Sequence, residues 1–577
     1  MPLSPPDSSI DGQLPAALEP KARWWREPEL GLLVLFAIGA FFVGMTDLSI
    51  RGEESRRALV AREMLQTGDW IVPRCQGVPL FSRPPLQNWL IALVGLMRGD
   101  IDAVALRLPS DCAMLLTVIL IYGYARTFLS RTGALTAGAA YASMGQVLEL
   151  GRTGETDALF TLFVSGSLLL WHLCYTRRVS AGLTWGLGYA LAGLGTLTKG
   201  PQAPIYFVAA VGAYLLWTGH WRYALSRAHA AGIGLFCAVV GAWQVPFLLS
   251  MGTDGSEEMY LTDIGHRFLD TSWPTILEHV AGYPLEVAAC MLPWSVLLAA
   301  LCIPRFARGL GAARSPLVFL VTCLAVTFPT VWLPPGARPR YFFCLYPCAA
   351  VLAGIAAERM WRARHEPSIR LFWTGFVRAA SIAMIGAGTG ILILSLAQTD
   401  FWLTQTRTVA CCYTLACVLL AALTWRSLRS DSRRSRRLAV LAIAGFMALT
   451  QGSVFINALK SVSVDTEGAV AALSRKLPAD AQLVSFGQVH HLFVYYYRKS
   501  IPVEVWPKAA DEADEAIQYF CVEPGRLERE KLPFRWEPVA DINCDRRLMK
   551  PALSRVIVGR RLDGHATAGA PHESAVR

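Results

Sequence analysis

Long apolar segments recur along most of the 577-residue chain, and each approaches the roughly 20 residues that a membrane-spanning helix needs. Lipid cannot satisfy backbone polar groups, so every span must be helical. The pattern predicts thirteen spans, at residues 30–47, 105–127, 132–150, 158–176, 180–197, 202–218, 231–250, 286–304, 316–334, 341–358, 371–397, 406–425 and 437–458. We therefore expect a polytopic α-helical membrane protein with about thirteen transmembrane helices.

The pattern changes after Lys460. The runs AQLVSFG and LFVYYYR are typical of strands, whereas DTEGAVAALSRKL has the spacing of an amphipathic helix. The sequence thus predicts a soluble α/β domain at residues 461–577, frayed after about Gly564. Residues 1–27 are interpreted as a disordered tail, and residues 28–460 as a transmembrane domain whose first external loop covers residues 47–104.

Composition agrees with a membrane protein, because 54% of the residues are hydrophobic and only 17% are charged, against about 25% in soluble domains. The net charge of +11 does not indicate a nucleic-acid partner, since the basic residues fall in short loops between spans. The first 20 residues lack the features of a signal peptide. Most of the 14 cysteines lie in apolar spans, where they are expected to be small buried hydrophobic residues.

The basic residues predict the orientation. Alternate loops carry them, and the most basic run of all is RSLRSDSRRSRR at residues 426–437. The other pairs and groups are Arg126 and Arg131; Arg177 and Arg178; Arg222 and Arg227; Arg305, Arg308 and Arg314; and Arg359, Arg362, Arg364 and Arg370. The positive-inside rule makes this face cytoplasmic. We expect a bacterial inner-membrane protein with a cytoplasmic N-terminus and a periplasmic C-terminal domain, where Cys521 and Cys544 could form a disulfide.

Five unusual loops share the opposite face by the parity of the spans. They cover residues 47–102, 151–157, 199–202, 251–286 and 334–340, and they carry both carboxylates and cations. A single charge in a membrane loop is commonly a solvated cap. Five such loops on one face favour an assembled site.

The first loop is the richest in chemistry. EESRRALVAREMLQTG and PLQNWLIALVGLMRG both have helical spacing and can lie in the membrane interface. Glu53 and Glu54 stand at the start of the first helix, where the macrodipole favours negative charge, and Arg56 can position them. Glu53 is the predicted catalytic base, with Glu54 in support. The alternative is a helix that only anchors the loop at the interface.

Two further loops add one carboxylate and one cation. GRTGETDALF places Asp157 at the outer mouth of the fourth span, where it supports catalysis or serves as a helix N-cap. Lys199 ends the fifth span just before a Gly-Pro step, where it binds an anion or acts as a snorkelling anchor.

The remaining cations suit a phosphate. Arg83 lies in the first loop, and Arg338 and Arg340 precede the tenth span; Arg binds phosphate through a bidentate fork, although simple interfacial anchoring is the alternative. With Arg56 and Lys199 they would stabilise a departing phosphate while a carboxylate accepts a proton. There is no Gly-rich phosphate loop, so a lipid phosphate is favoured over a nucleotide donor.

No cofactor is indicated by the sequence. A divalent metal is compatible with the carboxylates, but no metal-ligand spacing stands out. His490 and His491 would point to opposite faces of a strand, which argues against a shared metal site.

These residues resemble a known family. EESR, AREMLQTGDWIVP, LFSRPPLQNWL and LRLPS look like the first external loop of the bacterial aminoarabinose transferases that modify lipid A, and of the wider protein O-mannosyltransferase-like branch of the C-type glycosyltransferases. The likeness continues in order through ETDALF, LTKGP, the HRF of His266 to Phe268, LPW at Leu292 to Trp294 and the Arg340–Tyr341 step, and covers about residues 25–350.

The resemblance implies an inverting transfer of a sugar from a polyprenyl-phosphate donor, on the periplasmic face, to a lipid, glycan or protein acceptor. It implies that Glu53 stands where the family usually has a catalytic Asp, so the extra methylene moves the carboxylate by about 1 Å. The family's Phe-Glu-Lys-Pro becomes Phe81-Ser82-Arg83-Pro84 here. Arg83 keeps the positive charge of the family's Lys with a different geometry, and Ser82 replaces its acidic Glu.

Two other functions compete with this one. A transporter or lipid flippase would also be polytopic, but it usually carries ionisable residues at the membrane midplane and internal repeats, neither of which is evident here. A catalytically inactive envelope scaffold or sensor is the third hypothesis. The presence of Glu53 and Glu54 argues against it.

Overall fold

The computed structural model describes residues 23–262, 272–303, 306, 309–399, 401–430, 432–509, 512, 514, 517–544 and 554–562. Most of the predicted N-terminal tail, the HRF motif at His266 to Phe268, the loop arginines Arg305 and Arg308, and the frayed end after Gly564 lie outside these residues. Contacts divide the chain into two compact units. The helical unit comprises the described residues up to Ser49, Asp69–Pro73 and Leu80–Lys460, and the mixed unit comprises Ile50–Gly68, Arg74–Pro79 and the described residues from Ser461 onward.

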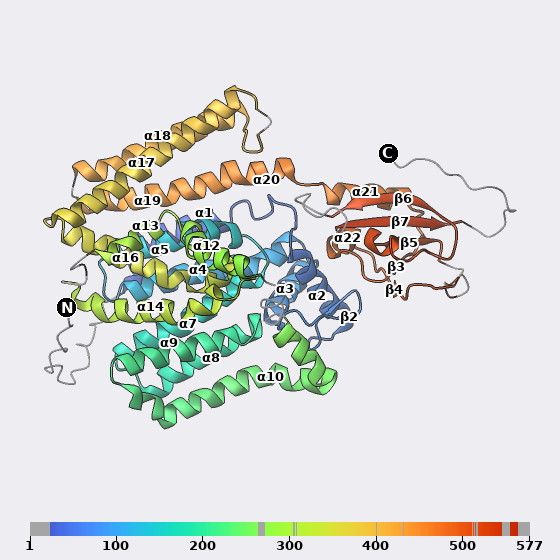
Figure 1. Cartoon of the computed structure of the whole chain (residues 1–577), viewed down its shortest axis with the longest axis horizontal. Coiled ribbons are helices and arrows are strands. Elements are labelled where there is room, and N and C mark those ends of the chain that lie inside the picture. Colours follow the sequence, from blue (N-terminus) through green and yellow to red (C-terminus); the bar gives the residue numbers. More distant parts are fainter. Residues whose placement is uncertain are drawn as a thin grey trace. The chain divides into compact units, whose positions relative to one another are not determined.

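The helical unit is built from long apolar helices (Figure 1). Its first half contains η1 (Trp24–Arg26), α1 (Pro28–Phe41), α3 (Leu86–Arg98), α4 (Ala103–Ala125), α5 (Arg131–Ser143), α6 (Gly145–Leu150), α7 (Thr156–Thr176), α8 (Ala181–Lys199), α9 (Gln202–Trp217), η2 (Trp221–Leu225), α10 (Arg227–Glu257) and η3 (Glu258–Thr262). Its second half contains α12 (Trp273–Cys290), α13 (Ser295–Leu298), η4 (Ala299–Cys302), η5 (Gly311–Ala313), α14 (Arg314–Thr327), α15 (Pro329–Trp332), η6 (Pro339–Leu345), α16 (Tyr346–Arg362), α17 (Pro367–Leu396), α18 (Arg407–Arg429), α19 (Arg433–Leu449), η7 (Thr450–Phe455) and α20 (Ile456–Val462).

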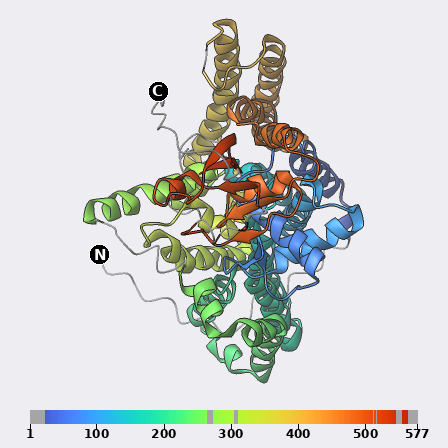
Figure 2. The same ribbon diagram turned by 90° about the vertical axis from the view of Figure 1, so that its right-hand side faces the viewer.

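Eight helices among the described residues are long and apolar enough to cross a membrane, or nine if the bent pair Trp273–Cys290 and Ser295–Cys302 is one span. The unit is therefore a multi-pass helical membrane fold. Helices α17 and α18 lie side by side (Figure 1), and Figure 2 shows this pair standing out from the other helices of the unit.

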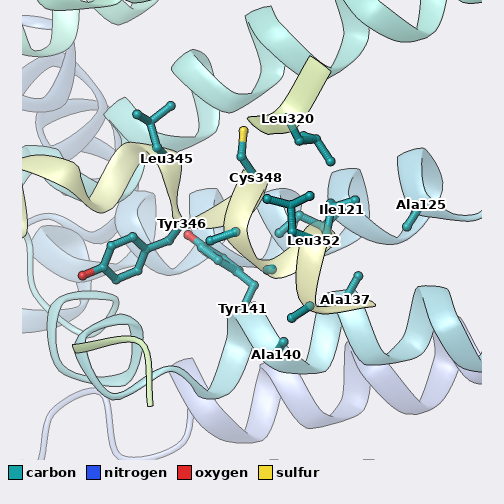
Figure 3. Packing of buried hydrophobic residues seen from close by; sticks show 14 of the residues in the cluster. Ile121, Ala125, Ala137, Ala140, Tyr141, Leu320, Leu345, Tyr346, Cys348 and Leu352 are labelled. Carbon is teal, nitrogen blue, oxygen red and sulfur yellow. The ribbon is translucent and has the colours of Figure 1, made fainter. Parts of the chain in front are cut away.

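The core of the helical unit lies where α4, α5, α14 and α16 meet. Figure 3 shows side chains from all four helices in one cluster, with Ile121, Leu320 and Leu352 grouped together and Tyr141 of α5 beside Tyr346. Tyr141 is fully buried. Small residues allow the helices to approach closely, as is usual in membranes. At Gly354 of α16, an added Cβ would lie 2.8 Å from the Cβ of Ala137, so only glycine fits there.

The mixed unit combines a five-stranded sheet with helices. The sheet has the order β4-β3-β5-β7-β6; β3 pairs in parallel with β4 and β5, and β7 pairs antiparallel with β5 and β6. Its elements are β3 (Leu483–Phe486), β4 (Val503–Glu504), β5 (Tyr519–Val522), β6 (Trp536–Asn543), β7 (Arg555–Arg561), α21 (Thr466–Lys476), α22 (His491–Tyr497) and α23 (Pro524–Leu527). Phe486, Trp506 and Phe520 form its aromatic core.

The prediction of a strand at LFVYYYR is wrong. LFVYYYR is the helix α22 and not a strand, although its aromatic and β-branched residues have high strand propensity. Packing decides the conformation here, because Leu492, Phe493 and Val494 are all buried. Cys521 and Cys544 are buried free thiols and form no disulfide, and burial raises the pKa of each to about 12.

Candidate functional site

The first loop contributes a helix and a hairpin to the mixed unit. Helix α2 (Glu54–Thr67) begins after Glu53 and ends at Gly68, whose positive φ of 74° closes the helix in the left-handed conformation. The hairpin joins β1 (Arg74–Cys75) to β2 (Val78–Pro79). The predicted helix EESRRALVAREMLQTG is thus present, and so is the second one, which is α3 of the helical unit.

Glu53 and Glu54 differ sharply in environment. Glu53 is 40% exposed and forms an ion pair with Arg56, with 2.7 Å between Oε2 and Nη1. Glu54 is fully buried, and its Oε2 accepts a hydrogen bond from the backbone N–H of Arg51 at 2.9 Å. This reach back across three residues resembles a capping box, so Glu54 fixes the start of α2. Glu53 is the carboxylate that a substrate can reach.

Helix α2 packs on α22 through polar contacts that the sequence did not reveal. Ser55 is buried, and its Oγ lies 2.6 Å from Nδ1 of His491. The phenol of Tyr496 accepts a hydrogen bond from the backbone N–H of Ile50, and Arg62 donates to the carbonyl of Tyr495. These contacts hold the helix that follows Glu53 against the C-terminal part of the same unit.

The hairpin is held in the same way. Gln76 has a backbone φ of 56°, which is unusual for a residue other than glycine or asparagine. Its amide donates to the carbonyl of Val489 at 2.8 Å and accepts from the N–H of Val489 at 3.2 Å. Glu63 of α2 accepts the backbone N–H groups of Gln76 and Gly77. Burial raises the pKa of Glu63 despite these two hydrogen bonds.

His491 is held neutral in this interface. Burial, together with the positive charges of His490, Arg56 and Arg57, lowers the pKa of His491 to about 2. The rings of His490 and His491 lie side by side with 4.4 Å between their centroids, so the prediction that they point to opposite faces is wrong. They begin a helix and not a strand, which changes the direction of both side chains.

The depressed pKa of His491 predicts a pH dependence of stability. In the unfolded chain His491 takes up a proton near pH 6.5, whereas the folded unit resists protonation until about pH 2. Its contribution to stability is therefore complete above about pH 6.5 and is lost as the pH falls below that value. Between pH 8 and pH 5, the melting temperature of the natural protein should fall more steeply with decreasing pH than that of His491→Asn. His365→Asn removes an exposed histidine of the helical unit and should leave the slope unchanged; equal slopes in all three proteins would contradict the prediction.

The helical unit brings together a second set of charged groups. Nζ of Lys199 lies 2.5 Å from Oδ1 of Asp157, and the two side chains are 8% and 3% exposed. Arg340 is 3.2 Å from Glu155 and 3.9 Å from the other carboxylate oxygen of Asp157. The charge of Arg83 also acts on Asp157. Four of the loop charges that the sequence placed on one face, Arg83, Asp157, Lys199 and Arg340, thus form one cluster.

The local structure explains the geometry of this cluster. Asp157 lies in the first turn of α7, where the macrodipole favours a carboxylate; the N-cap of that helix is Glu155, so the interpretation of Asp157 as the N-cap is wrong. Lys199 is the last residue of α8, and Gly200 ends that helix with a φ of 108°. The ammonium lies over the rings of Phe160 and Tyr341, at 5.5 and 5.8 Å.

Arg338 does not join the cluster through any contact found in the described parts of the chain. Its side chain is exposed, and its carbonyl accepts a hydrogen bond from Tyr283. Arg56, Glu53 and Glu54 belong to the mixed unit, whereas the other predicted site residues belong to the helical unit. No group of three or more His, Cys, Asp or Glu side chains among the described residues could hold a metal ion.

Comparison with known proteins bears on this arrangement. The family of dolichyl-phosphate-mannose-protein mannosyltransferases matches residues 82–245, which include Arg83, Asp157 and Lys199. An undecaprenyl phosphate-alpha-4-amino-4-deoxy-L-arabinose arabinosyl transferase of Pseudomonas aeruginosa is 31% identical over 351 residues, 57% of this chain and 60% of that protein. The predicted resemblance to the aminoarabinose transferases is confirmed.

A similar transferase from Yersinia enterocolitica is 26% identical over 359 residues, 58% of this chain. The chain spans about 60% of the length of these curated relatives. The crystal structure of ArnT from Cupriavidus metallidurans bound to undecaprenyl phosphate superposes with a TM-score of 0.67 and 18% identity, and the match covers 92% of this chain and 97% of that one. The fold is therefore that of ArnT.

The sequence missed several residues of the site region. Ser55, Gln76 and His491 make the contacts that hold the first loop in the mixed unit, yet no pattern in the sequence assigned a role to any of them, although Ser55 lies within EESR. Their partners lie more than 400 residues away along the chain, so periodicity could not pair them. Glu155, the partner of Arg340, could have been found from its place beside Asp157 in ETDALF.

Proposed function

We propose that the protein is an inverting glycosyltransferase that moves a sugar from undecaprenyl phosphate or a similar polyprenyl phosphate to a lipid A-type acceptor. Glycan and protein acceptors are the alternatives that the experiment below distinguishes. The observation that carries the proposal is the buried Asp157–Lys199 pair with Arg340 and Arg83 around it. It supplies fixed positive charge in a fold shared with a protein whose structure contains undecaprenyl phosphate.

Each group has a role in the transfer. Glu53 accepts the proton of the acceptor hydroxyl while the oxygen of that hydroxyl forms the new bond to the anomeric carbon. The bond from that carbon to the phosphate oxygen breaks, and the polyprenyl phosphate leaves with the negative charge. Arg83 and Arg340 stabilise this charge, with Arg56 and Arg338 as further phosphate-binding groups. Glu54 fixes the start of α2, and the Asp157–Lys199 pair positions Arg340.

We further propose the topology that the sequence predicts. Thirteen spans, including shorter or less apolar helices such as α1, α5 and α9, would place the N-terminus in the cytoplasm of a bacterial inner membrane. The odd number would place the sheet of the mixed unit in the periplasm. The distribution of arginines between alternate loops supports this orientation.

A transfer assay with the purified full-length protein tests the function. The protein is incubated with a labelled undecaprenyl-phosphate sugar and, in separate reactions, with lipid A, envelope polysaccharide and envelope protein. We expect a sugar-dependent mass increase in lipid A and release of undecaprenyl phosphate in equal amount. Labelling of a glycan or protein instead would correct the acceptor alone.

The same preparation in liposomes tests the competing function. Translocation of the lipid-linked sugar across the bilayer, with no glycosylated product from any acceptor, would contradict the glycosyltransferase and establish a flippase. We expect product formation without net translocation.

A further inference from the structure

The most basic run of the chain has no part in the proposed transfer. The end of this run, residues 433–437, begins α19 and includes Arg433, Arg436 and Arg437. A cavity of about 640 Å³ lies where the end of α4, the start of α5, the end of α16 and the start of α19 meet, all within the helical unit. Six arginines line it: Arg126, Arg131, Arg362, Arg433, Arg436 and Arg437.

This cavity is remote from the proposed catalytic cluster. Arg340 lies in η6 at the beginning of the continuous helical segment Pro339–Arg362, and Arg362 of the cavity ends it. At 1.5 Å per residue, those 24 residues extend over about 35 Å, which is the thickness of a membrane. The cavity and the cluster thus lie at opposite ends of the same helix.

Three carboxylates lie beside the cavity. Glu27 pairs with Arg126 at 2.8 Å and with Arg131 at 3.2 Å. Glu358 pairs with Arg362 and also accepts the backbone N–H and the hydroxyl of Ser130. Glu29 pairs with Arg437 at 2.6 Å. Three carboxylates thus form ion pairs with four of the six arginines that line the cavity, Arg126, Arg131, Arg362 and Arg437.

Two of the lining arginines, Arg433 and Arg436, stand in the first turn of α19. Arg433 makes no ion pair with any described residue, and the guanidinium of Arg436 lies 5.6 Å over the ring of Trp361. Trp361 is 6% exposed, and its indole N–H has no hydrogen-bond acceptor within the described ranges. Helices α5 and α19 both begin at the cavity, and their N-termini add partial positive charge.

We propose that this cavity binds a phosphate-bearing anion, and that its occupant is the headgroup of an anionic phospholipid from the leaflet opposite the proposed sugar donor. A guanidinium fork matches the oxygens of a phosphate, and basic pockets between transmembrane helices suit lipid headgroups. The cavity volume falls in the range of pockets that hold small molecules. Six guanidinium groups around one cavity suit a headgroup with two phosphodiesters, as in diphosphatidylglycerol.

Two adjacent arginines provide a matched test. Arg433 lines the cavity, whereas Arg434, the next residue of the same helix, is exposed and does not. Binding is measured on the full-length protein in detergent with short-chain diphosphatidylglycerol as the probe and short-chain phosphatidylcholine as the zwitterionic control. We expect the double variant Arg433→Gln/Arg436→Gln to bind diphosphatidylglycerol at least about tenfold more weakly than the natural protein. Arg434→Gln should bind as the natural protein does.

Further measurements separate the outcomes. Inorganic pyrophosphate should compete with the lipid, and pyrophosphate binding without lipid binding would make free phosphate the occupant. Equal weakening in Arg434→Gln and the double variant, or equal binding of phosphatidylcholine, would overturn the proposal by showing that only overall charge matters. If the double variant does not fold, Arg433→Gln alone removes a solvent-exposed side chain and gives the same comparison. Sugar transfer from a saturating donor should continue in all folded variants.

Discussion

Replacing Glu53 with Gln is expected to slow sugar transfer by about 10²–10⁴-fold, the usual contribution of a general base. The amide cannot accept the proton of the acceptor hydroxyl, although it has nearly the same shape. The loss of stability should stay below about 1 kcal/mol, because Glu53 is 40% exposed and its ion pair with Arg56 is accessible to water. The measurement is kcat/KM with a labelled lipid-linked sugar, together with the melting temperature.

Glu467→Gln is the matched control for this variant. Glu467 is an exposed carboxylate in the first turn of α21 and lies in the same unit, so it shares with Glu53 the charge and a place near a helix N-terminus. Its replacement should leave transfer unchanged. Glu54→Gln should instead lower the melting temperature, because Glu54 is fully buried and its carboxylate holds the start of α2. Near-full turnover by Glu53→Gln would remove Glu53 from the proposed chemistry.

Replacing Lys199 with Met is expected to destabilise the helical unit by about 3–5 kcal/mol, because it leaves the carboxylate of Asp157 buried without its nearest cation. Asp157→Asn should lower the stability by a similar amount, because it leaves the ammonium of Lys199 buried without its carboxylate. The double variant Asp157→Asn/Lys199→Met should be more stable than the sum of the two single changes predicts, since neither charge is then left alone. Thermal unfolding in detergent gives all three values.

Arg98→Met serves as the control for burial. Arg98 and Asp102 also lie 2.5 Å apart, but these side chains are 43% and 32% exposed, so the loss of stability should be much smaller than for Lys199→Met. Transfer by Lys199→Met should fall together with the melting temperature if the pair positions Arg340. A raised KM for the donor with an unchanged melting temperature would instead show that Lys199 binds the phosphate directly.

Local patterns predicted the elements that carry the site. The apolar runs indicated a multi-pass helical membrane fold, and helical spacing indicated α2 and α3. The parity of the spans placed Arg83, Asp157, Lys199 and Arg340 on one face, and these four form one cluster in the structure. That inference succeeded because a membrane forces successive helices to run in opposite directions, so position along the chain alone determines the end at which a loop lies.

The contacts of the first loop could not be predicted in this way. Nothing in EESR indicates that Ser55 meets His491, and strand propensity gave the wrong structure for the helix that carries His491. The long-range packing of α22 against α2 overrides that propensity, because burying its apolar side chains outweighs a weak local preference.

The sequence by itself therefore determined the class of fold, the resemblance to the aminoarabinose transferases and the residue types available for phosphate-linked transfer. Only the tertiary structure decided that Glu54 is buried while Glu53 is exposed, that Lys199 is paired with Asp157, and that six arginines surround one cavity at the other end of α16. The physical reason is that hydrophobic periodicity reports which face of an element is buried. Burial and pairing of an individual charge depend on residues that are close in space and distant along the chain.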